Sequence, residues 1–142
     1  MIGLDILQPV VALAAWTMVM WAWLYATRIP AMMAAKIDPD STARDPEFSL
    51  AKVLPVQVRW KADNYNHLHE APTVFYAVAI VLAITGHRHG LSAAAAWLYV
   101  ALRVIHSLVQ ATVNRVTLRF AVFVLSSLVL IALIVRAALV LF

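Results

Sequence analysis

A short run of mostly polar and ionisable side chains stands out in a chain that is otherwise strongly apolar. The run is Asp63-Asn64-Tyr65-Asn66-His67-Leu68-His69-Glu70, and Pro72 and a long apolar stretch follow it. Charged groups at membrane depth cost about 2.5–3.5 kcal/mol each on insertion scales, so they persist where they have a partner or a task. We therefore expect the functional residues to lie in this run.

The spacing of these residues predicts that they share one face of a helix. At about 100° per residue, steps of three and four return to the same face. The predicted face comprises Arg59, Asp63, Asn66, His67 and Glu70, whereas Asn64 and His69 point elsewhere and could serve an interface. A second stripe with the same spacing follows later in the chain and comprises Arg103, His106, Ser107, Gln110 and Asn114. Arg119 begins a third polar face.

Depth sets a register between the first two stripes. If Arg59 and Asn114 lie at the same membrane surface, Glu70 and Arg103 both lie about 16 Å deeper, at about 1.5 Å per residue. When a buried carboxylate and a guanidinium lie at the same depth, their pairing lowers the free-energy cost of burying both charges. The same register places Asp63 opposite Gln110, and Asn66 and His67 opposite His106 and Ser107.

Two readings of this network remain open. It could be structural glue, because hydrogen bonds between helices in membranes contribute about 0.6 kcal/mol each. It could instead line a polar cavity, since it holds more groups than one ion pair needs. Pro72 leaves the carbonyl of Leu68 without its helical donor, which predicts a kink just past Glu70 that serves either packing or the site.

The histidines do not predict a metal site. His67 and His69 diverge by about 200° on a helix, so they cannot ligate one ion together. Two histidines from different helices could hold a haem, but an orienting hydrogen bond is the commoner use. No short nucleotide-binding, hydrolase or zinc motif is present.

Composition indicates the elements that position these residues. The 142 residues are 64% hydrophobic and 13% charged, against about 45–50% and about 25% in soluble domains. This predicts a single all-α integral membrane domain, a bundle of four transmembrane helices over residues 6–25, 56–85, 92–113 and 117–142, with a polar loop over 27–52. Gly86 is expected to end the second helix and Ser92 to cap the third. Membrane lipids are the expected surroundings, nucleic acid is not an expected partner, and the absence of cysteine excludes disulfides.

Basic residues predict the orientation of the bundle. Most basic residues lie in the connection between the first and second spans, at the start of the second helix, and in the turn between the third and fourth spans. They are Arg28, Lys36, Arg44, Lys52, Arg59, Lys61, Arg115 and Arg119. The opposite side has Arg88 in its loop and Arg136 near the last turns. Because cytoplasmic loops are rich in Lys and Arg, we expect both basic connections in the cytoplasm and both termini on the far side. The N-terminus lacks a basic region typical of a signal peptide, so the first apolar stretch is read as a retained span.

The chain resembles the membrane-associated proteins in eicosanoid and glutathione metabolism (MAPEG), and in particular a bacterial branch of that family. The resemblance covers nearly the whole length. It lies in the four-span plan, the polar block that ends in Glu70 near a proline, Arg103-x-x-His106, and the short turn that leads to Arg119.

Membership would imply a homotrimer in a bacterial inner membrane, with glutathione in a cytoplasm-facing cleft between adjacent subunits. By position, Glu70 would hold the glutathione amine, and Arg119 would stabilise its thiolate as the catalytic residue. The other residues implied at the cleft are Arg28, Asn66, His67, Arg103, His106 and Gln110. This chain also departs from better-studied members: it has Asp63 and Asn66 where they carry basic residues, and Gln110 and Phe123 where they carry aromatic hydroxyls.

Three functions follow as hypotheses. The first is a membrane-embedded, glutathione-dependent transferase or peroxidase-like enzyme that acts on lipophilic electrophiles. The second is a non-catalytic membrane subunit that binds a lipid, a quinone or a partner membrane protein. The third is a proton or small-solute pathway. It is disfavoured because a pathway needs polar residues through to the far side, and the second helix has almost none after Thr73.

Overall fold

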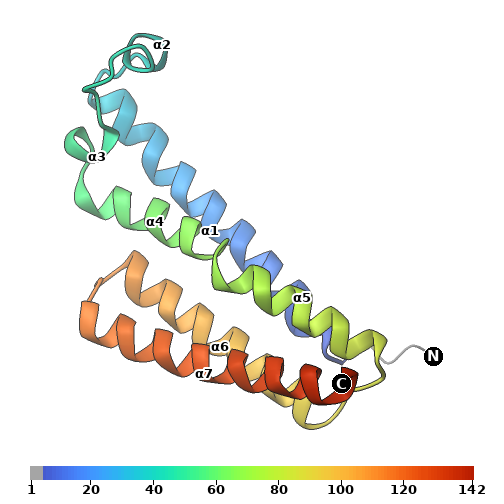
Figure 1. Ribbon diagram of the computed structural model, residues 1–142. Coiled ribbons are helices and arrows are strands. Elements are labelled where there is room, and N and C mark those ends of the chain that lie inside the picture. Colours follow the sequence, from blue (N-terminus) through green and yellow to red (C-terminus); the bar gives the residue numbers. More distant parts are fainter. Residues whose placement is uncertain (1–4) are drawn as a thin grey trace.

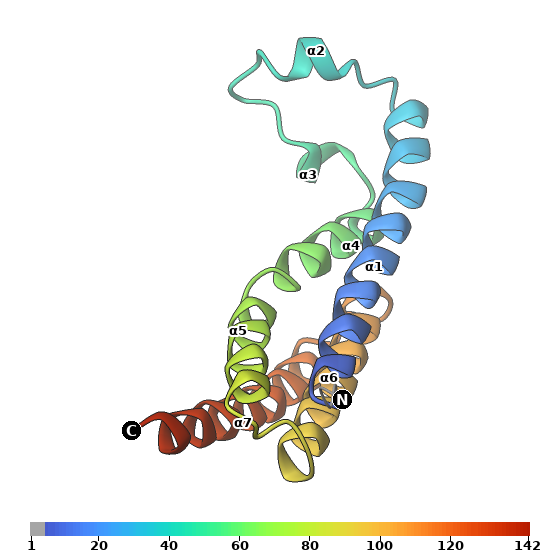
Figure 2. The same ribbon diagram turned by 90° about the vertical axis from the view of Figure 1, so that its right-hand side faces the viewer.

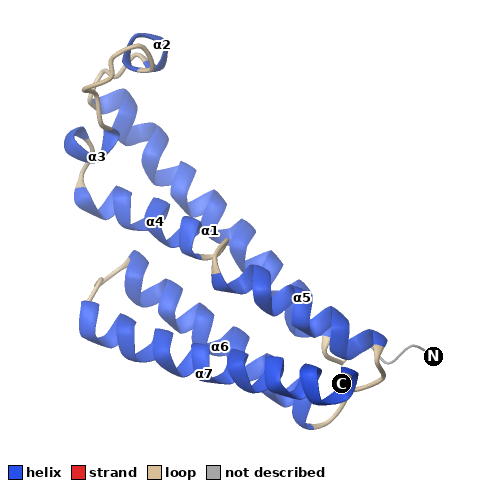
Figure 3. Cartoon of the chain, viewed as in Figure 1, coloured by secondary structure: helices blue, strands red, loops and turns tan. Residues whose placement is uncertain are grey.

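Four membrane-spanning segments make up most of the chain, as the sequence predicts. The computed structural model describes residues 5–142; helices account for 79% of them and no strand occurs among them (Figure 3). The helices are α1 (Leu7–Ala34), α2 (Pro39–Thr42), α3 (Leu50–Val53), α4 (Val56–His67), α5 (Ala71–Ile84), α6 (Leu91–Ala111) and α7 (Val116–Leu141). Four stretches are long and apolar enough to cross a membrane, namely α1, α4 with α5, α6, and α7. The prediction of an integral membrane four-helix bundle is confirmed.

The bundle has two distinct ends (Figures 1 and 2). The loop end carries the connection 35–55 and the turn 112–115, and the terminal end carries the start of α1, the turn 85–90 and the C-terminus. At the terminal end the Asp5 carboxylate contacts Nδ1 of His89, which links the start of the bundle to the α5–α6 turn.

The first helix is longer than the sequence indicated. α1 continues to Ala34, whereas a loop was expected from Thr27. Charge and Pro30 suggested the loop, but Pro30 removes only one backbone donor and its neighbours favour a helix. The helix ends where Lys36 adopts a left-handed conformation with φ 53°. The short helices α2 and α3 follow in the connection, which turns back from the end of α1 toward α4 (Figure 2).

The second span is broken rather than merely kinked. α4 ends at His67 and α5 begins at Ala71, so the break covers residues 68–70, directly before the position at which the sequence predicted a kink. Pro72 lies in the first turn of α5 and cannot donate to the carbonyl of Leu68. The break lets the two halves choose different partners: α4 packs against α1 and α6, while α5 packs against α7 and α1.

Glycines end and begin the helices at the terminal end. Gly86 has φ 82°, and the N–H groups of Gly86 and His87 donate to the carbonyls of Ala83 and Leu82 at 3.3 and 2.9 Å. This is the hydrogen-bond pattern of a glycine-ended helix, as predicted. The start of α6 differs from expectation, because its cap is Gly90 with φ 60°, and Ser92 is a buried residue inside the first turn.

An apolar core fills the half of the bundle toward the terminal end. Phe75 of α5 stacks on Tyr99 of α6 with ring centroids 4.5 Å apart, and both side chains are fully buried. Leu13 of α1 and Leu133 of α7 belong to the same cluster. A cluster of buried polar side chains lies toward the loop end instead, and it comprises Asn64, Arg103, His106, Ser107 and Gln110.

Candidate functional site

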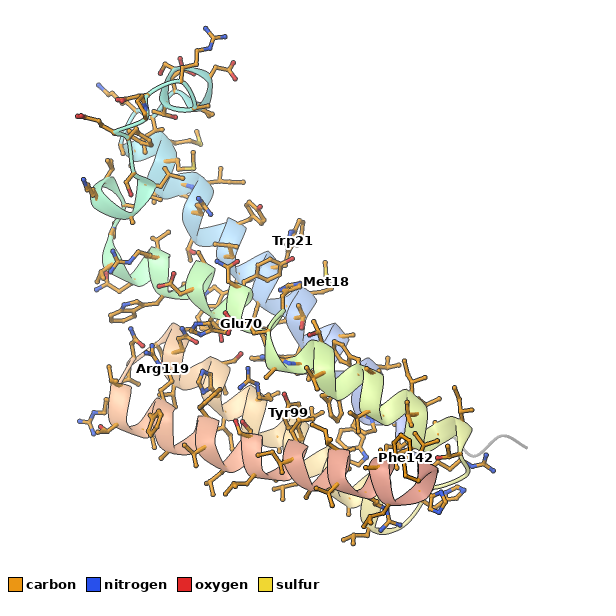
Figure 4. All side chains as sticks on the ribbon, in the orientation of Figure 1. Met18, Trp21, Glu70, Tyr99, Arg119 and Phe142 are labelled. Carbon is orange, nitrogen blue, oxygen red and sulfur yellow. The ribbon has the colours of Figure 1, made fainter. Side chains whose placement is uncertain are left out.

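A cavity of about 210 Å³ lies between the junction of α4 and α5, the middle of α6 and the start of α7. Its lining comes from the end of α4, the break, the start of α5, α6 and the start of α7. The lining residues are His67, Glu70, Ala71, Arg103, His106, Val116, Arg119, Phe120 and Phe123. Figure 4 shows Glu70 at the break and Arg119 near the start of α7, on opposite sides of this region. Five residues expected at the cleft from the sequence thus line one cavity: His67, Glu70, Arg103, His106 and Arg119.

Arg119 is held by the turn between α6 and α7. Its Nη1 donates to Oδ1 of Asn114 at 2.6 Å. Asn114 adopts a left-handed conformation with φ 47°, and its backbone N–H donates to the carbonyl of Val109 at 2.7 Å. Asparagine tolerates this conformation better than most residues. Asn114 therefore holds the side chain of Arg119 in place. The sequence placed Asn114 in a polar stripe but indicated no role for it. Its position in a short turn, five residues before Arg119, was the feature that could have suggested this contact.

His106 is oriented by the backbone of α7. Its Nδ1 lies 3.2 Å from the carbonyl oxygen of Arg119, and because a carbonyl can only accept, Nδ1 is the donor. The other nitrogen, Nε2, is buried and has no partner among the described residues.

Arg103 is a buried cation with free donors. Only 3% of its surface is exposed, and its Nη2 donates to the backbone carbonyl of His67 at 3.3 Å. Its Nε and Nη1 are buried without a partner in the described chain. Glu70 lines the same cavity, as the register predicted, but the two side chains form no ion pair. Two nitrogens of the guanidinium therefore have no acceptor among residues 5–142.

Two side-chain hydrogen bonds join α4 to α6 behind the cavity. Nδ1 of His67 and Oε1 of Gln110 are 3.0 Å apart, and Oγ of Ser107 donates to Oδ1 of Asn64 at 2.9 Å. Gln110 is thus buried behind His67 and does not line the cavity. Asn64 faces α6, although the helical wheel pointed it elsewhere. The register placed Asn66 and His67 opposite Ser107 and Asp63 opposite Gln110, whereas Ser107 meets Asn64 and Gln110 meets His67. A helical wheel gives relative angles only and cannot tell which neighbouring helix a face meets.

Arg28 and Asn66 line a different cavity. This second cavity, of about 230 Å³, lies between α1, α3 and α4, and its polar residues are Arg28, Arg59, Asp63 and Asn66. Within one chain these residues are therefore separate from Arg119. The helix-face pattern could not foresee this, because α4 presents its polar side chains to two neighbours.

The arrangement favours an anionic ligand with an apolar part. Two basic residues, Arg103 and Arg119, and one acidic residue, Glu70, line the cavity, and Phe120 and Phe123 supply apolar surface. A cation beside a thiol favours its thiolate form. Among residues 5–142, no group of three or more His, Asp or Glu side chains is arranged to hold a metal ion.

Comparisons with known proteins add one match. The model of the MAPEG family matches residues 6–139, which is nearly the whole chain. Neither curated proteins nor solved structures gave a significant match. Since the family model covers all four membrane-spanning helices and the cavity between α4, α6 and α7, the chain belongs to the MAPEG family.

Proposed function

We propose that the protein binds glutathione in the Arg119 cavity and uses its thiol to conjugate or reduce lipophilic electrophiles. One observation carries the proposal: Arg119 is fixed by Asn114 at 2.6 Å beside a cavity that also holds Arg103 and Glu70. The family is associated with glutathione, which supports this choice of ligand.

Each cavity residue would have a distinct task. Arg119 would stabilise the thiolate, because a fixed cation placed where negative charge develops is an effective catalytic device. The unpartnered donors of Arg103 would bind a carboxylate of glutathione, and Glu70 would bind its amine. Phe120 is 63% exposed and Phe123 is 40% exposed, so these side chains could admit an apolar substrate from the bilayer.

The size of the cavity supports a site shared between subunits. Pockets for small molecules usually enclose about 300–1,000 Å³, more than the roughly 210 Å³ found in one chain. In a homotrimer, the neighbouring chain could add its second cavity, which would bring Arg28 and Asn66 to the ligand. We infer that the trimer completes the site.

The same proposal places the loop end in the cytoplasm of a bacterial inner membrane. The excess of Lys and Arg in the two connections at that end supports this orientation. The cavity would then open toward the cytoplasmic supply of glutathione.

The test is a calorimetric titration of the purified protein with glutathione and with a non-thiol analogue. We expect both to bind. Arg119→Ala should lower turnover of a chromogenic aryl halide by about 10²–10³-fold while leaving the assembly intact. Unchanged turnover in this variant would remove Arg119 from the mechanism. Absence of glutathione binding, with a partner protein co-purifying in stoichiometric amount, would instead favour the non-catalytic membrane subunit.

A further inference from the structure

We propose that His67 is the general base that takes the proton from the bound thiol, and that Gln110 orients it for this task. The inference rests on the proposed glutathione-dependent function and adds a second catalytic residue to it. It arises from the position of the imidazole, its hydrogen bond to Gln110 and the side chains that surround it.

The hydrogen bond to Gln110 determines which imidazole nitrogen is free. Nδ1 of His67 lies 3.0 Å from Oε1 of Gln110, an amide oxygen that can only accept. Nδ1 is therefore the donor, and a neutral imidazole then carries its lone pair on Nε2. Gln110 is 1% exposed and enclosed in the bundle, so the acceptor is held in place.

His67 stands at the edge of the cavity. It is the last residue of α4, directly before the break, and it lines the cavity together with Arg119. Its backbone carbonyl accepts a hydrogen bond from Nη2 of Arg103 at 3.3 Å, which fixes the end of the helix. Nε2 of His67 makes no hydrogen bond to the described residues, and it is not among the buried unpartnered atoms. This nitrogen is therefore available to a ligand.

His106 is the alternative base, and its geometry is less suitable. Its ring centroid is 6.3 Å from that of His67, and its Nδ1 also donates to a carbonyl. Its Nε2, however, is buried beyond the reach of solvent, so a thiol could reach it only if the side chain moved. Of the two imidazoles, only that of His67 has a lone pair that a ligand can reach.

The proposed step balances without a further reactant. The S–H bond of glutathione breaks, its proton passes to Nε2 of His67, and Arg119 stabilises the thiolate. The thiolate sulfur forms a bond to the electron-poor carbon of an aryl halide, and the carbon–halogen bond breaks as halide leaves with the electron pair. The imidazolium then releases its proton to water. An imidazole oriented by an amide also activates the thiol of papain-like proteases, where the thiol belongs to the enzyme.

The test compares two histidines of the same segment. His67→Gln removes the base, and His69→Gln is the matched control, since His69 is exposed, bonds the carbonyl of Tyr65 at 2.8 Å and lies outside the cavity. General-base catalysis contributes about 10²–10⁴-fold, so we expect His67→Gln to lose at least about 10²-fold in kcat/KM for the aryl halide near neutral pH. The loss should shrink at alkaline pH, where the free thiol ionises by itself. His69→Gln should match the wild type.

Gln110 is tested as a positioning residue. Gln110→Met removes the acceptor and should move the pH profile of kcat/KM toward that of His67→Gln. Gln110→Glu keeps an acceptor oxygen and adds a negative charge that favours the imidazolium form, so it should keep the base limb of the profile but move that limb to higher pH. A purely structural role for Gln110 would lower the rates of both variants without changing the shape of their pH profiles, and that result would overturn its assignment.

A binding measurement separates failure of this inference from failure of the proposed function. Ultraviolet absorbance reports the thiolate of bound glutathione, and calorimetry with a non-thiol analogue shows that each variant still folds and binds. If the wild type binds no glutathione, the proposed function fails. If stopped-flow absorbance shows that the wild type forms the thiolate and that His67→Gln forms it at the same rate at the same pH, His67 is not the base.

Discussion

The two halves of the second span join the bundle by different forces. α4 is held to α6 by hydrogen bonds between side chains, Asn64 with Ser107 and His67 with Gln110. α5 is held by apolar packing, of which the stacked pair Phe75 and Tyr99 is the centre. Packing within lipid supplies association but little direction, whereas hydrogen bonds fix the direction of each group. The break at 68–70 thus separates a half that is anchored by apolar packing from a half whose side chains are oriented by hydrogen bonds.

The largest effect is expected when the apolar contact of α5 with Tyr99 is removed. Phe75→Ala should lower the free energy of unfolding by about 3 kcal/mol, the low end of the range for such truncations, because lipid is as apolar as the vacated site. Thermal unfolding in detergent measures the change. Ile84→Ala is the control on the same helix, since Ile84 is 81% exposed. Equal effects of the two changes would mean that α5 has no special anchoring contact.

A smaller effect is expected when the orientation of a functional group is disturbed. Asn114→Gly keeps the left-handed turn but removes the acceptor from Arg119, and hydrogen bonds to charged groups contribute about 1.5–3 kcal/mol. We expect a loss of about tenfold or more in the rate of glutathione conjugation, with little change in stability. Thr112→Ala, at the end of the same helix, is the control. A wild-type rate in Asn114→Gly would show that Arg119 needs no support.

The smallest effect is expected from the hydrogen bonds between α4 and α6. Ser107→Ala leaves Oδ1 of Asn64 without its donor and should cost about 0.6 kcal/mol, and at most about 1.7 kcal/mol. A double-mutant cycle with Asn64→Ala measures the pair, and Ser127→Ala, whose hydroxyl bonds its own helix, is the control. A coupling energy above that of Phe75 with Tyr99 would reverse the comparison between the two halves.

The sequence predicted the features that depend on local pattern. Long apolar runs gave the four spans, because a bilayer requires about 20 such residues per helix. The spacing by three and four, together with the expected depth, predicted that His67, Glu70, Arg103 and His106 lie in one region. All four line the same cavity. Gly86 ended its helix as expected, since a left-handed conformation favours glycine.

The errors came from contacts that local pattern does not encode. Charge near Arg28 suggested a loop, but a charged segment can remain helical, and α1 continues to Ala34. Asn64 was assigned away from α6, yet it is fully buried against Ser107. A helical wheel fixes angles between side chains but not the direction of the neighbouring helices.

By itself, the sequence determined that this protein lies in a membrane, crosses it four times and keeps a polar cluster near one end. Those properties follow from hydropathy and helical period, which are local. The tertiary structure decided that Asn114 holds Arg119, that Gln110 orients His67, and that Arg28 and Asn66 line a separate cavity. These contacts depend on how the two halves of the broken span pack against α1, α6 and α7, and such packing is set by side chains far apart in the chain.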